Sequence, residues 1–296
     1  MKYDQAFFDA GIDRIGTRCE KWDDPGFCQP GDLAMWVADW DFRCAQPIID
    51  ALRSRAEHGC YGYSCDDKND KAAFCAYWQR RHRLTIQPEQ TVMLPCVVTG
   101  LRQAVLTFTD PGDQIAIMTP LYAPFYDAIS RSGRQIAAIP MQKDDAARYH
   151  IDFNALEDAL KNGVRMILFC NPHNPVSRAW RIDELKRLVD LAKTYDALIA
   201  SDEIHADFVY QPHVFHPMLS IPEAAERTIM FAVFAVYCWA LPLFFALAIL
   251  LRSFSSFRAR RSAVKRSLSS FTMRLYAVLP GPPPTGAYPI SRASVS

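Results

Sequence analysis

The chain lacks the marks of several common protein classes. Its nine cysteines include no Cys-x-x-Cys pair and no regular spacing, which favours reduced thiols over a disulfide framework or a zinc site. We therefore expect no metal ligands. The N-terminus has no basic and then apolar layout of the kind that marks a secretory signal peptide.

Acidic residues are missing from the last part of the chain. Residues 1–226 hold all 32 acidic side chains and 24 of the 33 basic ones, a net charge of −8, whereas residues 227–296 hold nine basic side chains and no acidic one. Residues 229–251 are twenty-three uncharged residues followed by several arginines. That length and that basic flank predict a membrane-spanning helix with its basic end in the cytoplasm. Residues 252–296, rich in serine, arginine and proline, are predicted to be disordered or linker-like.

Half of the residues are apolar, so the chain can bury a sizeable core. Two short apolar runs, residues 164–170 and 197–201, read as buried strands, and residues 182–192 between them place apolar side chains at helical spacing. A strand, a helix and a strand predict a right-handed parallel crossover. Polar motifs end both strands, Cys-Asn-Pro-His-Asn-Pro-Val at 170–176 and Ser-Asp-Glu-Ile-His at 201–205.

Ligands of open parallel sheets collect at the carboxyl ends of the strands. We therefore expect Asn174, Asp202 and His205 to face one crevice. The spacing of apolar residues predicts further helices and strands in the rest of the chain. We predict helices over 47–58, 70–82, 95–108 and 153–160, and strands over 91–94, 114–118, 134–140 and 228–231.

The two motifs, in this order and one strand-helix-strand unit apart, resemble the pyridoxal-phosphate (PLP) enzymes of the aminotransferase class I/II family. The resemblance is strongest to the branch of bacterial cystathionine β-lyases and other C–S lyases, and it covers residues 1–231. It implies the aspartate aminotransferase fold, fold type I: an α/β structure with a parallel-rich sheet and flanking helices, here truncated, with the C-terminal part transmembrane-like or disordered. It also implies a cytoplasmic homodimer that acts on a small amino-acid substrate.

The resemblance assigns roles to the polar residues after the strands. A buried carboxylate keeps the pyridine nitrogen of PLP protonated, as an electron sink requires, and Asp202 takes that role. Asn174 corresponds to the residue that donates to the ring oxygen of the cofactor, and His205 stands near that oxygen or is simply a packed histidine. In relatives a segment similar to residues 35–42 lies beside the substrate, which places Asp39 near the site; an aromatic clamp on the core is the alternative.

Other matches concern the ring and the phosphate of PLP. Tyr122 corresponds to the aromatic residue that stacks on the pyridine ring, although tyrosine at a strand end is often plain packing. Cys96, Val97 and Val98 match the phosphate loop, where a helix N-terminus presents free N–H groups. Without a glycine-rich fingerprint this turn is otherwise an ordinary strand-to-helix connection. Tyr63 matches a tyrosine that reaches the phosphate across a dimer interface.

One expected residue is missing. The family continues from its next strand into a loop of the type Ser-x-Ser-Lys-Thr-Phe-Asn, whose lysine forms the internal Schiff base. Beyond Lys193 the only lysine is Lys265, which has none of the expected neighbours. We therefore assign no catalytic residue and expect no β-lyase turnover from this chain. Its lineage implies release of thiol, pyruvate and ammonia from an S-substituted cysteine such as cystathionine; an aminotransferase or a non-catalytic, membrane-anchored or regulatory protein are the alternatives.

The sequence suggests four segments: an N-terminal arm (1–46), a partial PLP-binding large domain (47–231), the hydrophobic segment (229–251) and a basic tail (252–296). We interpret the abrupt change after about residue 231 as a reading-frame error, with a genuine membrane anchor as the alternative. Resequencing codons 225–260 and finding no frame that restores the lysine loop would contradict the first interpretation. Residues 252–274 also resemble a basic patch for acidic lipids or nucleic acid, but they lack the aromatic platforms of single-strand binders, so we expect no nucleic-acid partner.

Overall fold

The computed structural model describes residues 3–29, 31–63, 68–233 and 246–250. The chain divides into two units, Met1–Ser253 and Phe254–Ser296, and the second unit lies outside the described residues. The predicted segment boundaries therefore stay predictions.

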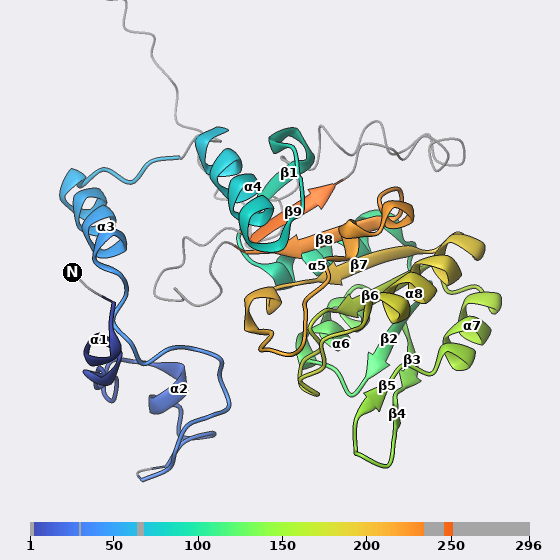
Figure 1. Ribbon diagram of the computed structural model, residues 1–296, viewed down its shortest axis with the longest axis horizontal. Helices are drawn as coiled ribbons and strands as arrows, with labels where there is room; N and C mark the ends of the chain where they lie inside the picture. Colours follow the sequence, from blue (N-terminus) through green and yellow to red (C-terminus); the bar gives the residue numbers. More distant parts are fainter. Residues whose placement is uncertain (1–2, 30, 64–67, 234–245, 251–296) are drawn as a thin grey trace, which may run out of the picture. The chain divides into compact units, whose positions relative to one another are not determined.

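Helices and strands alternate through most of the first unit (Figure 1). The helices are α1 (Gln5–Asp9), α2 (Glu20–Asp23), α3 (Gln46–His58), α4 (Lys68–His82), α5 (Val97–Phe108), α6 (Ala123–Ser130), α7 (Phe153–Lys161) and α8 (Ile182–Thr194), with short 3-10 turns η1 (Pro88–Gln90), η2 (Ala206–Phe208), η3 (Met218–Ser220) and η4 (Pro222–Ala224). The strands are β1 (Thr91–Leu94), β2 (Gln114–Thr119), β3 (Gln135–Pro140), β4 (Gln142–Lys143), β5 (Tyr149–His150), β6 (Met166–Cys170), β7 (Leu198–Asp202), β8 (Thr228–Ala232) and β9 (Ala246–Leu250).

A mostly parallel sheet organises this unit. Within the described residues it has seven strands in the order β1-β9-β8-β7-β6-β2-β3 (Figure 1). The strands from β8 to β3 pair in parallel, whereas β9 runs antiparallel to both β8 and β1. Helix α6 connects the parallel strands β2 and β3, and α8 connects β6 and β7, as the strand-helix-strand pattern predicted for the second pair.

Each face of the sheet is covered by helices. Alternate residues of β6 and β7, such as Phe169 and Ile199, pack in one core cluster with Leu185 and Leu188 of α8. The opposite face meets α5, where Gly100 lies directly against Phe231 of β8. Because both faces are buried, β6, β7 and β8 are nearly continuous apolar runs with no polar alternation.

Local chemistry fixes several helix ends. The Oδ1 atom of Asp152 accepts from the backbone N–H groups of Asn154 and Ala155 and caps α7. In α8, Glu184 accepts from the backbone N–H of Arg181 at 2.9 Å. Helix α3 has proline in its first turn and ends at Gly59, whose φ of 70° is left-handed.

The helices and strands predicted between residues 47 and 231 are confirmed, with ends that differ by at most two residues. Helix α6 was not predicted, and residues 119–125, which include Pro124, were expected to form the loop after the strand at 114–118. The structure places this proline in the first turn of α6, where its missing N–H costs no hydrogen bond. The two-stranded β4-β5 pair was also missed, because two-residue strands leave no periodicity.

The expected membrane-spanning helix over residues 229–251 is wrong. Its first part belongs to β8 and its last part to β9, and these strands pair antiparallel, with Ala232 opposite Leu247. A straight helix of this length would hold its ends about 34 Å apart, which is incompatible with paired strands. Apolarity alone does not distinguish a buried strand from a helix. In the described part of the chain, no helix combines the length and the apolar character needed for a bilayer crossing.

We expect Gly100→Ala to lower the free energy of unfolding. A Cβ atom at this position would lie 2.6 Å from the ring of Phe231, and such overpacking typically costs about 1–3 kcal/mol. That cost exceeds the gain of about 1 kcal/mol from better helix propensity. Denaturant titration at neutral pH measures the change. Gly62→Ala is the control, because nothing lies within 4 Å of its Cβ position; unchanged or increased stability of Gly100→Ala would contradict the packing of α5 on β8.

Candidate functional site at the carboxyl ends of the parallel strands

The register of β6 and β7 brings the two sequence motifs together. Cys170 pairs with Asp202, and Asp202 pairs in turn with Phe231 of β8. The backbone N–H of Asn171 donates to the carbonyl oxygen of Asp202 at 2.8 Å, so pairing extends one residue beyond β6. Register partners in parallel strands point to the same face. The side chains of Cys170 and Asp202 therefore point, with Phe231, to the face that α5 covers.

Asp202 is a buried carboxyl group, with 5% of its surface exposed. Its Oδ1 atom accepts from the backbone N–H of Ile204 at 3.0 Å. Burial raises the pKa of Asp202 to about 7, and this one backbone hydrogen bond offsets the rise only in part. A cationic group next to Asp202 would restore its charge, because an opposite charge lowers the pKa of a carboxyl group.

Cys170 links Asp202 to Asn174 of the first motif. Its thiol is buried, accepts from the backbone N–H of Asn174 at 3.4 Å and donates to the carbonyl oxygen of Pro172 at 3.2 Å. Burial and then the charge of Asp202 raise the pKa of Cys170 well above its usual value. The thiol is therefore a neutral packing group that holds half-buried Asn174 near Asp202.

Tyr122 and the start of α5 lie at the same place. Burial raises the pKa of Tyr122, and the charge of Asp202 adds to the rise, followed by smaller effects of Glu20 and Cys96. Cys96 is the N-cap of α5 and accepts from the backbone N–H of Thr99 at 3.4 Å. Tyr122 therefore lies within electrostatic range of Asp202 and of the N-cap of α5.

Val97 and Val98 form the first turn of α5. Val97 is buried and Val98 is exposed, so their backbone N–H groups start a helix whose positive end meets the surface. His205, the N-cap of η2, follows the same strand end as Asp202, and burial lowers its pKa. Asn174, Asp202 and His205 all lie at or just after the carboxyl ends of parallel strands, and the expectation that they face one crevice stays a prediction.

Two further predicted residues, Tyr63 and Asp39, lie on other segments of the described chain. Tyr63 is 95% exposed and lies just before α4. The carboxylate of Asp39 is held by both terminal nitrogens of Arg14. Their proposed roles toward phosphate and substrate stay predictions.

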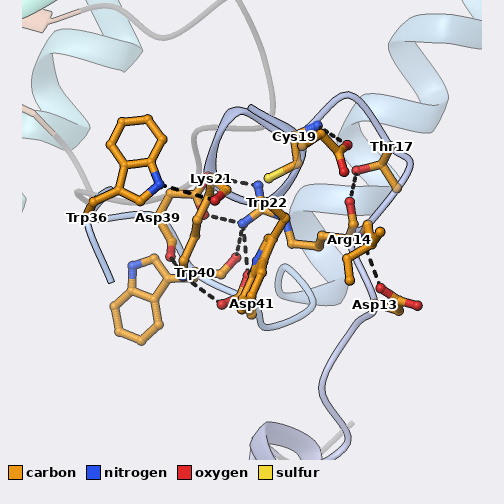
Figure 2. Close-up of polar contacts among 12 residues, drawn as sticks. Asp13, Arg14, Thr17, Cys19, Lys21, Trp22, Trp36, Asp39, Trp40 and Asp41 are labelled. Carbon is orange, nitrogen blue, oxygen red and sulfur yellow. Dashed lines mark hydrogen bonds and ion pairs between the residues drawn. The ribbon is translucent and has the colours of Figure 1, made fainter. Parts of the chain in front are cut away.

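The contacts of Asp39 belong to a polar cluster in the N-terminal arm (Figure 2). Asp41 accepts from Lys21 at 2.7 Å and from the indole N–H of Trp22 at 2.8 Å, and Arg14 lies 3.1 Å from the same carboxylate. Burial opposes the ionisation of Asp41, but these hydrogen bonds lower its pKa overall. The ring of Trp40 lies 6.0 Å from that of Phe208 in η2, so this cluster borders the loop that follows Asp202.

A second cluster, not found from the sequence, links α4 to η2. Asp207 accepts from the hydroxyl of Tyr77, and its Oδ1 atom lies 3.2 Å from both Nε of Arg81 and Nε2 of His82. The ring of His82 packs 4.5 Å from that of Trp78. Residues 77 and 207 are 130 positions apart, so no local pattern connects them.

The sequence and the fold were compared with known proteins. The family model "Aminotransferase class I and II" matches residues 45–236. The chain belongs to this family. It is 40% identical over 219 residues to cystathionine β-lyase PatB of Bacillus subtilis, which covers 73% of this chain and 56% of the relative. Cystathionine β-lyase of Corynebacterium glutamicum is 36% identical over 179 residues, 60% of this chain and 47% of the relative.

Solved structures place the chain in the same branch, that of cystathionine β-lyases and C–S lyases. Cystalysin of Treponema denticola, which contains a PLP cofactor, superposes with a TM-score of 0.78 at 29% identity over 91% of this chain and 68% of that one. The PLP-bound C–S lyase of Staphylococcus hominis superposes with a TM-score of 0.78 at 25% identity, over 92% of this chain and 67% of that one. The fold is therefore of the fold type I, PLP-aminotransferase kind. The chain spans about half the length of the curated relatives that it matches.

Asp207→Asn is expected to weaken the contact between α4 and η2. Burial alone would raise the pKa of Asp207, but contacts with His82, Tyr77 and Arg81 lower it to about 2. A carboxyl group with a depressed folded-state pKa stabilises above its unfolded value, near 4, and loses this contribution as the pH falls toward 2. We expect Asp207→Asn to lower the free energy of unfolding by about 2 kcal/mol at pH 7, and this difference should shrink as the pH falls toward 2.

Denaturant titrations at pH 7 and at pH 3 measure this difference. Asp158→Asn is the matched control, because Asp158 is an exposed carboxylate 3.6 Å from Lys161 and should change stability by less than about 0.5 kcal/mol. Equal effects of the two substitutions at pH 7 would contradict the assignment.

Proposed function

We propose that the site between the ends of β6 and β7 and the start of α5 binds PLP, and that its lineage is that of a cysteine-S-conjugate β-lyase. The observation that carries this proposal is the buried carboxyl group of Asp202, at the end of a parallel strand and on the face that α5 covers. PLP needs a buried anion next to its ring nitrogen and a helix N-terminus next to its phosphate, and few other cofactors need both.

The residues present fit the non-covalent part of PLP. Asp202 would face the pyridine nitrogen, and Asn174 and His205 would lie near the ring oxygen. The raised pKa of Asp202 supports this fit, since its negative charge is poorly compensated by the protein alone. A protonated ring nitrogen would supply the opposite charge that Asp202 lacks.

The ring and the phosphate have candidates of their own. Tyr122, 44% exposed and near Asp202, would stack on the ring and exclude water from one of its faces. Cys96, Val97 and Val98 would hold the phosphate at the N-terminus of α5, where backbone N–H groups and the helix dipole favour an anion. When bound, PLP supplies an electron sink for a substrate's α-carbon.

We propose that this chain binds PLP without turning over an amino acid. β-Elimination in this family requires an amine that moves the α-proton, and the sequence has no lysine between residues 194 and 264. Asp202 is acidic and placed for the ring nitrogen, so it does not replace that amine. An assay of the products released from cystathionine separates the two alternatives. An aminotransferase would yield a keto acid without free thiol, and a non-catalytic regulatory protein would yield neither.

The purified chain should bind PLP reversibly, and Asp202→Asn should weaken this binding. A hydrogen bond to a charged group is worth about 1.5–3 kcal/mol, which corresponds to a rise in Kd of about 10-fold to 100-fold. Equilibrium dialysis measures Kd, and borohydride treatment followed by mass spectrometry should find no covalent PLP adduct. Asp110→Asn, in the loop before β2, is the control substitution. Equal Kd values for Asp202→Asn and wild type would sink the assignment of Asp202.

The same preparation should release no pyruvate from cystathionine, while cystathionine β-lyase PatB of Bacillus subtilis serves as the positive control. Pyruvate release above the background of a heat-treated sample would show that the chain is a working lyase. The reading-frame interpretation of the composition change stays a prediction.

We also propose that the chain forms a homodimer through its N-terminal arm. Large apolar side chains there are strongly exposed, notably Leu33 and Met35, and such surface is costly to leave in water. A dimer would also bring Tyr63 to a neighbouring copy, as its assigned role requires. Sedimentation velocity should show a dimer in the wild type, and Met35→Asp with Leu33→Asp should shift it to monomer; a monomeric wild type at micromolar concentration would refute this proposal.

A further inference from the structure

Glu203 is a second buried carboxyl group beside Asp202, but on the other face of the sheet. It is 1% exposed. Its Oε1 atom accepts from the backbone N–H of Met218 at 2.8 Å and from the hydroxyl of Ser201 at 2.9 Å. Ser201 alternates with Asp202 along β7, and Met218 belongs to the core cluster that α8 covers. The two neighbouring carboxyl groups therefore point to opposite faces.

Two oxygen atoms near Glu203 lack hydrogen-bond partners. They are Oε2 of Glu203 itself and Oδ1 of Asn171, which are among the buried side-chain atoms of the described residues that have no hydrogen-bond partner. The amide nitrogen of Asn171 donates to the carbonyl oxygen of His216 at 2.9 Å, which fixes the orientation of the amide, because a carbonyl can only accept. Asn171 and Glu203 directly follow the register partners Cys170 and Asp202, so they are neighbours at the ends of the two strands.

We propose that Glu203 carries a proton in the folded chain and donates it from Oε2 to Oδ1 of Asn171. Two acceptor oxygens cannot satisfy each other, and an unpaired buried acceptor is costly. One proton on Oε2 gives both oxygens a partner and leaves Oε1 free to accept from Ser201 and Met218. The neutral acid then ties the ends of β6 and β7 to the segment 216–218.

The electrostatic environment supports this protonation state. Burial raises the pKa of Glu203 to about 8, against smaller opposing effects of Met218, Ser201 and Asn171. Asp202 is the charged group that acts on Glu203, and it raises that pKa further. Two adjacent anions in a buried site repel each other, so one of the pair is held neutral.

The consequence for PLP rests on the proposed function. Glu203 would be a positioning residue: it keeps β6 and β7 in register at the point where Asn174 and Asp202 leave them. Because Glu203 is neutral, Asp202 would be the single anion of the pair and would face the ring nitrogen without a competing charge beside it.

The pH dependence of unfolding tests the protonation state without PLP. A carboxyl group whose folded-state pKa is raised from near 4.5 to about 8 makes stability fall as the pH rises between these values. In wild type this group should raise the unfolding constant about tenfold per pH unit between pH 5.5 and pH 7.5. Glu203→Gln keeps the donor to Asn171 and cannot ionise, so its profile should lack this contribution while that of Asp202 remains.

Glu184→Gln is the matched control. Glu184 is also buried, but it pairs with Arg178 at 2.6 Å. At pH 7 its replacement should raise the unfolding constant at least about tenfold, since a charged partner is left unpaired. Glu203→Gln should change it by less than about threefold at pH 4.5, below which the wild-type carboxyl group is protonated in both states. At pH 7 the variant should lower the unfolding constant on the order of a hundredfold relative to wild type, because only the unfolded wild-type chain ionises at this position.

Identical pH profiles of wild type and Glu203→Gln would overturn the proposal, because Glu203 would then be ionised and would accept from the Asn171 amide instead. If Glu203→Gln does not fold, infrared spectroscopy of Asp202→Asn at pH 7 decides the matter. A protonated carboxylic-acid band in that variant supports the proposal, and its absence refutes it. Neither measurement involves PLP, so loss of PLP binding with an unchanged Glu203 proton would count against the proposed function alone.

Discussion

The parallel pairing of β6 with β7 is the constraint on which the site depends. Both strands are buried on both faces, so polar side chains are tolerated only where the strands end. The pairing of Cys170 with Asp202, continued by the Asn171 hydrogen bond to the Asp202 carbonyl, fixes where these ends meet. A slip of one residue would turn Asp202 toward α8 and bury Ser201 on the side of α5. Core packing and site geometry are therefore set by the same register.

The sequence was sufficient for the central part of the fold because that part has local signals. Strands β6 and β7 are short apolar runs that end in polar motifs, and α8 has clean helical spacing with a capping interaction at Glu184. Such patterns reflect burial on one or two faces, which a sequence records residue by residue. The same reasoning predicted that Asn174, Asp202 and His205 share one edge of the sheet, because strand ends in a parallel sheet converge; Tyr122 was assigned from the family resemblance alone.

Other features had no local signal. The contact between Tyr77 and Asp207 joins residues that only the tertiary structure brings together. Alternation along the strand implies that Asp202 and Glu203 point to opposite faces. Which carboxyl oxygens find hydrogen-bond partners, however, depends on tertiary neighbours such as Asn171 and Met218. The apolar segment after residue 228 was misassigned for a different reason: a strand buried in a sheet and a helix buried in a bilayer have the same composition. Only the pairing of β9 with β1 and β8 distinguishes the strand from a membrane helix.

The electrostatics of the strand ends follow from this burial. A carboxyl group without water must either find a cation, accept several hydrogen bonds or keep its proton. Glu203 has donors for one oxygen and a neighbouring acceptor for the other, which is the environment of a neutral acid. Asp202 accepts from one backbone N–H and lies on the face of the sheet that α5 covers, where its charge raises the pKa of Tyr122. Burial thus raises the pKa of both neighbouring carboxyl groups at the end of β7, but the two faces of the sheet offer them different partners.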